Sequence, residues 1–262
     1  MRPLRCFAVL FGLLALSDWL NPLGLSPEPG VVFLGKRLSG VPNLVAAWSF
    51  AFFLGCYALS LWREETAALP LGIAYAAYVC VNLHYSWLFT FRDAQAPYGS
   101  ARMLAIHAIV TLASAWGAVA LMVHRGLARR DRVPGRILLR SFALLFALMA
   151  LANALKPFAY AADVGLVLFG HRLAGAANTV AALTFSALLA TYSASIWTEK
   201  RRALPLGVAY ALYVIANLFL WTSHRPEQTD APMIFSLPYL AGAISASSGS
   251  ALLLWRYRNR LV

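Results

Sequence analysis

The chain has 262 residues, of which 61% are hydrophobic and only 12% charged, and its mean hydropathy is +0.67. Soluble domains carry about a quarter charged residues, so the composition excludes an ordinary soluble fold and indicates a membrane protein. The formal net charge of +12 does not predict a nucleic-acid partner, because basic residues in a membrane protein mark its cytoplasmic side and favour anionic lipid headgroups.

Eight apolar stretches are long enough for transmembrane helices, since a hydrocarbon core of about 30 Å requires roughly 20 residues. They cover residues 6–22, 41–62, 68–90, 102–123, 138–156, 175–197, 203–222 and 233–255. These stretches are about twice as long as a barrel strand requires, and helices satisfy their own backbone groups in lipid. The sequence therefore predicts an all-α integral membrane protein with eight transmembrane helices.

An internal repeat divides the chain. The segment Arg5-Cys-Phe-Ala-Val-Leu-Phe matches Arg140-Ser-Phe-Ala-Leu-Leu-Phe, and at the same offset of 135 positions residues 69–79 and 204–214 agree at 9 of 11 positions. We interpret this similarity as a tandem duplication. Residues 1–124 and 138–262 would each form a four-helix unit, joined by a basic cytoplasmic linker at 125–137. Four spans are an even number, so the two units should share one orientation, as in parallel-repeat transporters.

The basic residues also predict the orientation. If the N-terminus lies in the cytoplasm, 15 of the 22 basic residues fall on the inner side, and we expect both termini there. The bias toward Ala, Leu and Arg over Lys is typical of GC-rich bacterial genomes, which favours a bacterial inner membrane.

A polar motif, G-x-R-L-x-G-x-x-N, recurs between the first and second predicted helices of each unit. It places Arg37 and Asn43 in the first unit, and Arg172 and Asn178 in the second. One interpretation is structural, with arginines reaching lipid phosphates and asparagines bonding across helices. The other is that the two sets form an outward-facing site for an anion or lipid headgroup.

A second set of polar residues lies deep in the third predicted helix of each unit. Its members are Asn82, Tyr75 and Tyr78 in the first unit and Asn217, Tyr210 and Tyr213 in the second. A buried amide in lipid needs a partner, so these residues should face the bundle. They either form interhelical hydrogen bonds or line a polar cavity.

The leading hypothesis is a non-enzymatic carrier or binding protein for a small molecule or lipid. Its site would lie between the two pseudo-symmetric units, lined by the deep asparagines and tyrosines and gated by Arg37 and Arg172. A structural or assembly subunit of a membrane complex, or a homodimer, is the first alternative. The second is a membrane enzyme or haem protein using His84 and His107, which could share a depth on neighbouring helices. No G-x-S-x-G, H-E-x-x-H, P-loop or C-x-x-C signature is present in the sequence, so we expect neither cofactor nor nucleic acid.

Three features give the units a familiar layout. Met1-Arg-Pro-Leu leads into the first span, Pro70 begins the third, and Leu237-Pro-Tyr-Leu opens the last. In this layout each unit resembles the four-helix EXPERA module of emopamil-binding and sigma-2-receptor-type proteins, and is similar to small DoxX-like bacterial proteins. The resemblance implies a sterol- or lipid-binding module. However, Asn43 and Asn178 stand where such modules place an acidic residue, and the histidine of their third helix has no clear equivalent, so no ligand or activity is carried over.

Overall fold

The computed structural model describes residues 2–24, 30–34, 36–92, 134–159, 166–223 and 233–262. Within these ranges the chain is helical apart from two short hairpins. The described residues form seven α-helices: α1 (Arg2–Leu20), α2 (Gly40–Trp62), α3 (Ala68–Arg92), α6 (Pro134–Ala159), α7 (Gly175–Trp197), α8 (Ala203–Ser223) and α9 (Met233–Arg256). Two 3-10 turns, η1 (Asn21–Leu23) and η3 (Arg258–Arg260), follow α1 and α9. The prediction of an all-α protein is confirmed.

Five segments of these helices are long and apolar enough to cross a membrane. They are Leu4–Leu23, Gly40–Trp62, Gly135–Phe158, Gly175–Trp197 and Ala203–Trp221. They coincide with five of the predicted spans, and the chain is a membrane-embedded protein. Helices α3 and α9 cover the predicted spans 68–90 and 233–255 but are not among the five. The predicted span 102–123 and most of the linker 125–137 lie outside the described residues.

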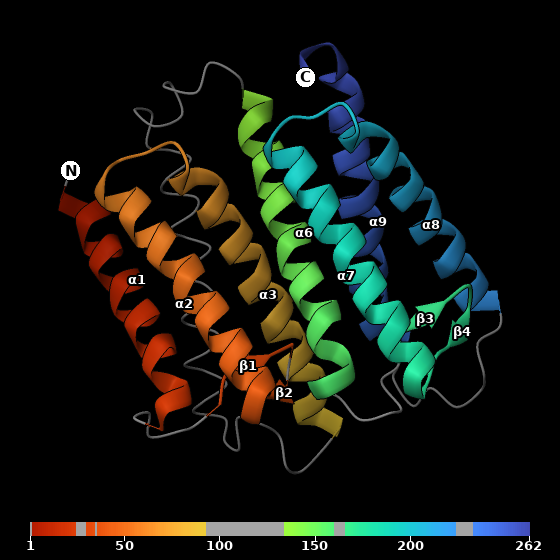
Figure 1. Cartoon of the computed structure of the whole chain (residues 1–262), viewed down its shortest axis with the longest axis horizontal. Coiled ribbons are helices and arrows are strands. Elements are labelled where there is room, and N and C mark those ends of the chain that lie inside the picture. The colour runs from red at the N-terminus through yellow and green to blue at the C-terminus, as the bar shows by residue number, and fades with distance from the viewer. Residues whose placement is uncertain (1, 25–29, 35, 93–133, 160–165, 224–232) are drawn as a thin grey trace. The chain divides into compact units, whose positions relative to one another are not determined.

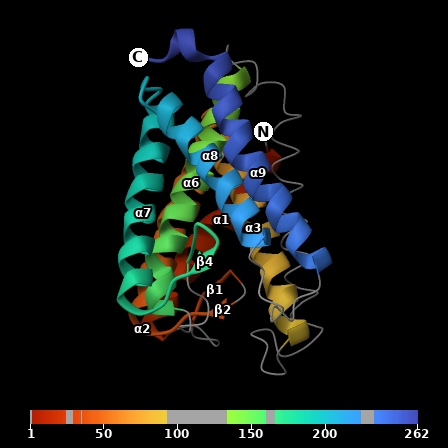
Figure 2. The same ribbon diagram turned by 90° about the vertical axis from the view of Figure 1, so that its right-hand side faces the viewer.

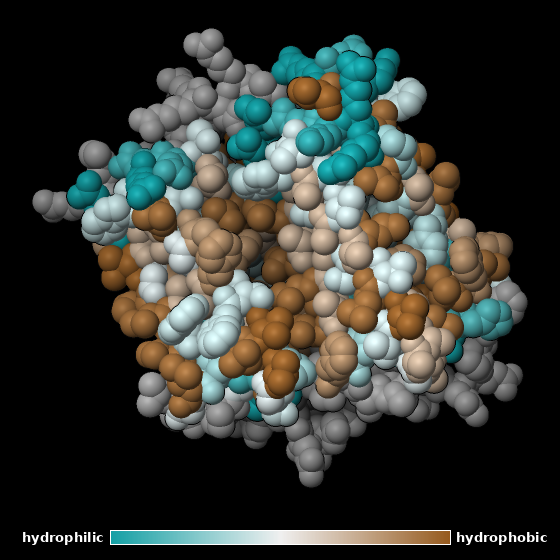
Figure 3. Space-filling model, viewed as in Figure 1, coloured by the Kyte–Doolittle hydropathy of each residue, from teal (hydrophilic) through white to brown (hydrophobic). Residues whose placement is uncertain are grey.

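The contacts divide the chain into two compact units, Met1–Ser141 and Phe142–Val262, with the boundary inside α6. In the first unit α1, α2 and α3 lie side by side (Figure 1), and in the second α8 packs along α9 (Figure 2). Large apolar side chains remain exposed on the helices: Phe52 is 75% exposed and Phe219 is 70% exposed. In Figure 3, hydrophobic residues cover much of the middle of the helices, and hydrophilic residues gather at the C-terminal end. This distribution suits a lipid environment.

Each unit carries a two-stranded antiparallel hairpin where the sequence predicted only a polar loop. The strands are β1 (Val32–Phe33) and β2 (Lys36–Arg37) in the first unit, and β3 (Val167–Leu168) and β4 (His171–Arg172) in the second. In the second hairpin both loop residues have positive φ, 46° at Phe169 and 81° at Gly170. A two-residue loop with this geometry matches the twist of the strands it joins. Such short strands have no long apolar alternation, so the sequence pattern did not reveal them.

An aromatic cluster fills the core of each unit. In the first, the ring of Phe11 lies 4.6 Å from Tyr57 and 5.6 Å from Tyr75. In the second, Phe146 lies 4.8 Å from Tyr192 and 5.6 Å from Tyr210. In both units the contact to α3 or α8 is edge-to-face, a favoured arrangement of aromatic rings. The helices of each unit are thereby held together by rings at equivalent positions of the repeat.

Candidate functional site

The hairpin of the second unit is fixed by side chains of α8. The Nδ2 group of Asn217 donates to the carbonyl oxygen of Val167 at 3.1 Å, and its Oδ1 accepts the backbone N–H of Gly170 at 3.2 Å. The hydroxyl of Tyr213 donates to the same Val167 carbonyl at 3.3 Å. Gly170 approaches α8 so closely that a Cβ there would lie 2.9 Å from the carbonyl carbon of Leu220. The amide predicted to line a cavity therefore joins the first strand of the hairpin to its loop.

Helix α7 supplies the second attachment. Asn178 is buried one turn after the start of α7, and its Oδ1 accepts the backbone N–H of Leu166 at 2.8 Å. Leu173 in turn donates its N–H to the Leu166 carbonyl at 2.9 Å, which closes the base of the hairpin. Buried backbone groups need such partners. Asn178 thus has a scaffolding role at the predicted outer end of the unit.

The scaffold presents basic side chains at this end of the helices. Arg172 is exposed on β4, and its guanidinium carbon lies 5.6 Å from the centre of the Trp221 ring on α8. His171, the residue before it, is also exposed. A guanidinium over an aromatic ring keeps a preferred orientation, and its planar donors match carboxylate and phosphate oxygens. Chemically, this surface can bind an anion.

The hairpin of the first unit is held by related contacts. The backbone N–H of Val31 donates to Oδ1 of Asn43 at 2.8 Å. Asn43 also donates through Nδ2 to Oδ1 of Asn21 at 3.4 Å, and that oxygen accepts the N–H of Gly30 at 3.0 Å. Arg37 donates to the Gly30 carbonyl at 3.4 Å. Here the arginine is half-buried and holds the loop, whereas its counterpart Arg172 is exposed.

The remaining predicted site residues divide between the hairpins and the cores. Tyr78 packs against Phe50 and the hairpin residue Phe33, with ring centres 4.7 and 5.9 Å away. Tyr75 and Tyr210 belong to the aromatic cores and are buried, and Asn82 is buried on α3. The structure therefore gathers Asn178, Tyr213, Asn217 and Arg172 at one hairpin but leaves Tyr210 apart from them. The expected site between the two units stays a prediction.

Only one of the two histidines proposed for a haem or enzyme site lies within the described residues. His84 lies in α3, while His107 is outside the described residues, so their pairing stays a prediction. Among the described residues, no group of three or more His, Cys, Asp or Glu side chains could hold a metal ion.

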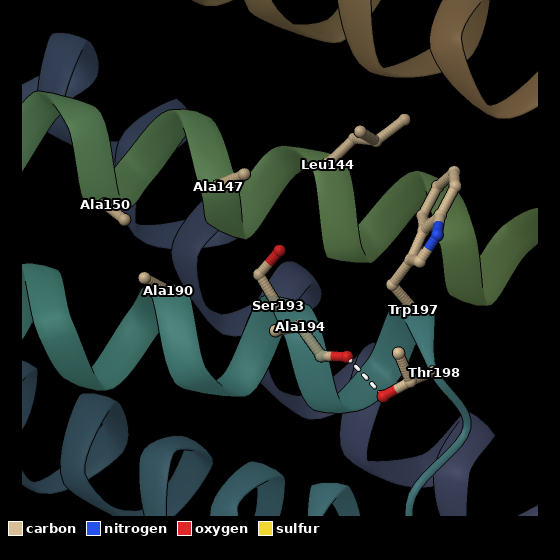
Figure 4. A pocket seen from close by; sticks show the side chains of 8 residues that line it. All are labelled: Leu144, Ala147, Ala150, Ala190, Ser193, Ala194, Trp197 and Thr198. Carbon is tan, nitrogen blue, oxygen red and sulfur yellow. Dashed lines mark hydrogen bonds between the residues drawn. The ribbon is translucent and has the colours of Figure 1, made fainter.

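A shallow groove of about 320 Å³ lies between α6 and α7 (Figure 4). It is lined by Leu144, Ala147, Ala150, Ala190, Ser193, Ala194, Trp197 and Thr198. Its hydroxyls are bonded to backbone, since Ser193 donates to the Ala143 carbonyl at 2.7 Å and Thr198 to the Ala194 carbonyl at 2.6 Å. The groove therefore presents mainly apolar surface, and none of the predicted site residues line it.

Two contributors were missed by the sequence interpretation. Asn21 corresponds to Lys156 at the repeat offset, so a search for shared residues passed over it. Trp221 has no special spacing, and its contact with Arg172 follows from the fold of the hairpin against α8. An aromatic and a basic residue predicted at the same membrane boundary were the only available signal.

Comparisons of the chain with protein-family models, curated proteins and solved structures found no match.

Proposed function

We propose that this chain is a non-catalytic membrane protein that binds an anionic amphiphile, either a lipid or a small organic anion, at its hairpins. The observation that carries the proposal is the position of Arg172. Its exposed guanidinium lies over the Trp221 ring of α8. The hairpin that carries Arg172 is held by Asn178 and Asn217. Basic and aromatic groups together suit the polar boundary of a membrane. The amphiphile would place its anionic group at the hairpin and its apolar part along the helices.

In this proposal the asparagines position the ligand-binding surface without touching the ligand. Both polar groups of the Asn217 side chain are engaged with hairpin backbone. The Oδ1 of Asn178 is likewise engaged with the N–H of Leu166. Loss of either amide should therefore weaken binding indirectly, by releasing the hairpin that carries Arg172.

The proposal includes eight spans in two tandem four-helix units. It is supported by equivalent contacts at the repeat offset, since Val31 bonds Asn43 and Leu166 bonds Asn178 at 2.8 Å in each case. The turn residues Leu34 and Phe169 also share a φ of 46°. A bacterial inner membrane with both termini in the cytoplasm completes the proposed arrangement, and it places the hairpins on the outer side.

The test begins with native mass spectrometry of the full chain, gently extracted from its own membrane with lipids retained. A discrete bound amphiphile is expected, and Arg172→Gln should lower its occupancy at least about tenfold, as expected for loss of a charge-assisted contact. Thr179→Ala is the control, because Thr179 follows Asn178 and its hydroxyl bonds the Gly175 carbonyl of its own helix. Unchanged occupancy in a folded Arg172→Gln variant would end the proposal.

A structural or assembly subunit is the second candidate. It is favoured by the use of Asn43, Asn178 and Asn217 in internal hydrogen bonds. The same experiment separates the two, because a structural subunit would be recovered in a larger stable assembly with no bound amphiphile.

A further inference from the structure

The connections that follow α2 and α7 share one backbone conformation. In the first unit the N–H of Glu65 donates to the Ser60 carbonyl at 2.9 Å, and in the second the N–H of Lys200 donates to the Ser195 carbonyl at 2.9 Å. The residues that turn the chain, both with φ of 54°, are Glu64 and Glu199. These bonds and the left-handed residue form a Schellman-type helix end. The two connections therefore differ in their side chains and hardly in their main chain.

Their charges are opposite. Residues 63–67 contain one arginine and two glutamates, and Arg63 lies 3.8 Å from Glu65. Residues 198–202 contain one glutamate followed by Lys200, Arg201 and Arg202. The reversed charge is therefore not required by the shared backbone. It gives the end of the second unit a positive surplus that residues 63–67 do not have.

The C-terminal segment adds further basic residues at the same place. Its backbone pairs with the α7–α8 connection: Arg201 donates its N–H to the Val262 carbonyl at 2.9 Å, and Val262 donates its N–H to the Glu199 carbonyl at 2.8 Å. The Nε of Arg201 also donates to the Leu261 carbonyl at 3.3 Å, and Leu261 is buried. Residues 256–260 are thus held beside residues 200–202, near the end marked C in Figures 1 and 2.

The result is a cluster of six exposed basic side chains, which we term the basic end. Its members are Lys200, Arg201, Arg202, Arg256, Arg258 and Arg260. In Figure 3 the hydrophilic colouring gathers at this end of the second unit. Clusters of four or more basic residues at the ends of membrane helices bind anionic lipid headgroups. Each basic residue raises the affinity about fivefold.

Aromatic residues place the basic end at the membrane boundary. Arg258 lies 4.8 Å from the centre of the Trp255 ring, and Arg260 lies 5.8 Å from that of Tyr257. Trp197 ends α7 and is 36% exposed. Tryptophan and tyrosine concentrate at headgroup depth. With about 1.5 Å per residue, the 23 residues of α7 separate this end from the hairpin by the thickness of a hydrocarbon core.

We infer that the basic end binds anionic phospholipid headgroups, in the leaflet opposite to the hairpins. The polar partner is a phosphate-bearing headgroup of net negative charge, contacted by residues 200–202 on one side and 256–260 on the other. This site is separate from the one proposed at Arg172, since the two lie at opposite ends of α7.

The test uses the full chain in detergent, titrated separately with phosphatidylglycerol and phosphatidylcholine and measured by native mass spectrometry. The first unit supplies the variant: Lys200→Glu, Arg201→Thr and Arg202→Ala replace the basic residues with those at the equivalent positions 65–67. We expect phosphatidylglycerol to bind the original chain at least about tenfold more tightly than phosphatidylcholine, and the graft to remove most of that preference. Thr179→Ala is the control and should retain it, because the Thr179 hydroxyl bonds the Gly175 carbonyl of its own helix.

Equal affinities for the two lipids in the original chain would overturn the inference, as would a full preference retained by a folded graft. If the graft does not fold, the reverse graft decides. Glu65→Lys, Thr66→Arg and Ala67→Arg place the basic residues on the equivalent backbone of the first unit. They should raise the affinity for phosphatidylglycerol at least about fivefold. A gain in a folded variant would support the inference, and the absence of any gain would reject it.

Discussion

The hydroxyl of Tyr192 donates a hydrogen bond to the hydroxyl of Ser250 across 3.0 Å in the core of the second unit. The direction follows from the single proton of Ser250, which is given to the carbonyl of Ser247 at 2.9 Å. The contact joins α7 to α9 between residues that are 58 positions apart. It therefore holds together two helices of this unit that are far apart in the sequence.

Tyr192→Phe should destabilise the protein by about 0.6 kcal/mol and by no more than roughly 1.7 kcal/mol, the range for such bonds in a bilayer. Ser250→Ala should remove the same interaction, so the double variant should lose less than the sum of the two single losses. Reversible unfolding in mixed micelles provides the free energies. Strict additivity would mean that the two hydroxyls do not interact.

Gly207→Ala should destabilise the second unit because a Cβ on this residue of α8 would overlap the Tyr192 hydroxyl and approach its ring. Overpacking of this kind costs about 1–3 kcal/mol. The control is Gly242→Ala in α9, where no atom of the described residues lies within 4 Å of the added Cβ. There we expect no loss, or a gain of up to about 1 kcal/mol from helix propensity. Thermal unfolding of both variants should show the larger loss of stability for Gly207→Ala. Equal effects would contradict the packing at Gly207.

Asn178→Ala leaves the backbone N–H of Leu166 without the oxygen that accepts it at 2.8 Å. An unsatisfied buried donor costs about 1–3 kcal/mol, and the hairpin that begins beside it should open more often. Amide hydrogen exchange should therefore accelerate in residues 166–173. Thr179→Ala serves as the neighbouring control. Unaltered exchange in the Asn178 variant would show that the hairpin is held without this amide.

Single cysteines can test the proposed eight-span arrangement, after replacement of the three free cysteines Cys6, Cys56 and Cys80. Thr66→Cys and Lys200→Cys lie in equivalent connections, and four proposed spans separate them. A membrane-impermeant maleimide should label both from the cytoplasmic side only. Phe169→Cys, on the second hairpin, should be labelled only from the opposite side. If positions 66 and 200 were labelled from different sides, the number of spans between them would be odd, and the tandem four-helix repeat would be wrong.

The sequence was informative where a feature is repeated or long. The apolar stretches predicted the five candidate spans because burial in lipid requires about 20 consecutive apolar residues, which a sequence displays directly. The apolar stretch 41–62 predicted α2, which begins at Gly40. Asn43, Asn178 and Asn217 were singled out because a buried amide in lipid requires a partner, and each has one.

Hydropathy and charge are properties of the chain, so they predicted a helical membrane protein, its polar residues of interest and the charge at each helix end. The contacts of those residues came from the tertiary structure. It placed Asn217 on the backbone of a hairpin 47 positions away and Arg172 over Trp221. It also held residues 261–262 beside Glu199 and Arg201. Such contacts depend on the distance and direction between groups from separate helices, and composition and spacing along one helix do not specify these quantities.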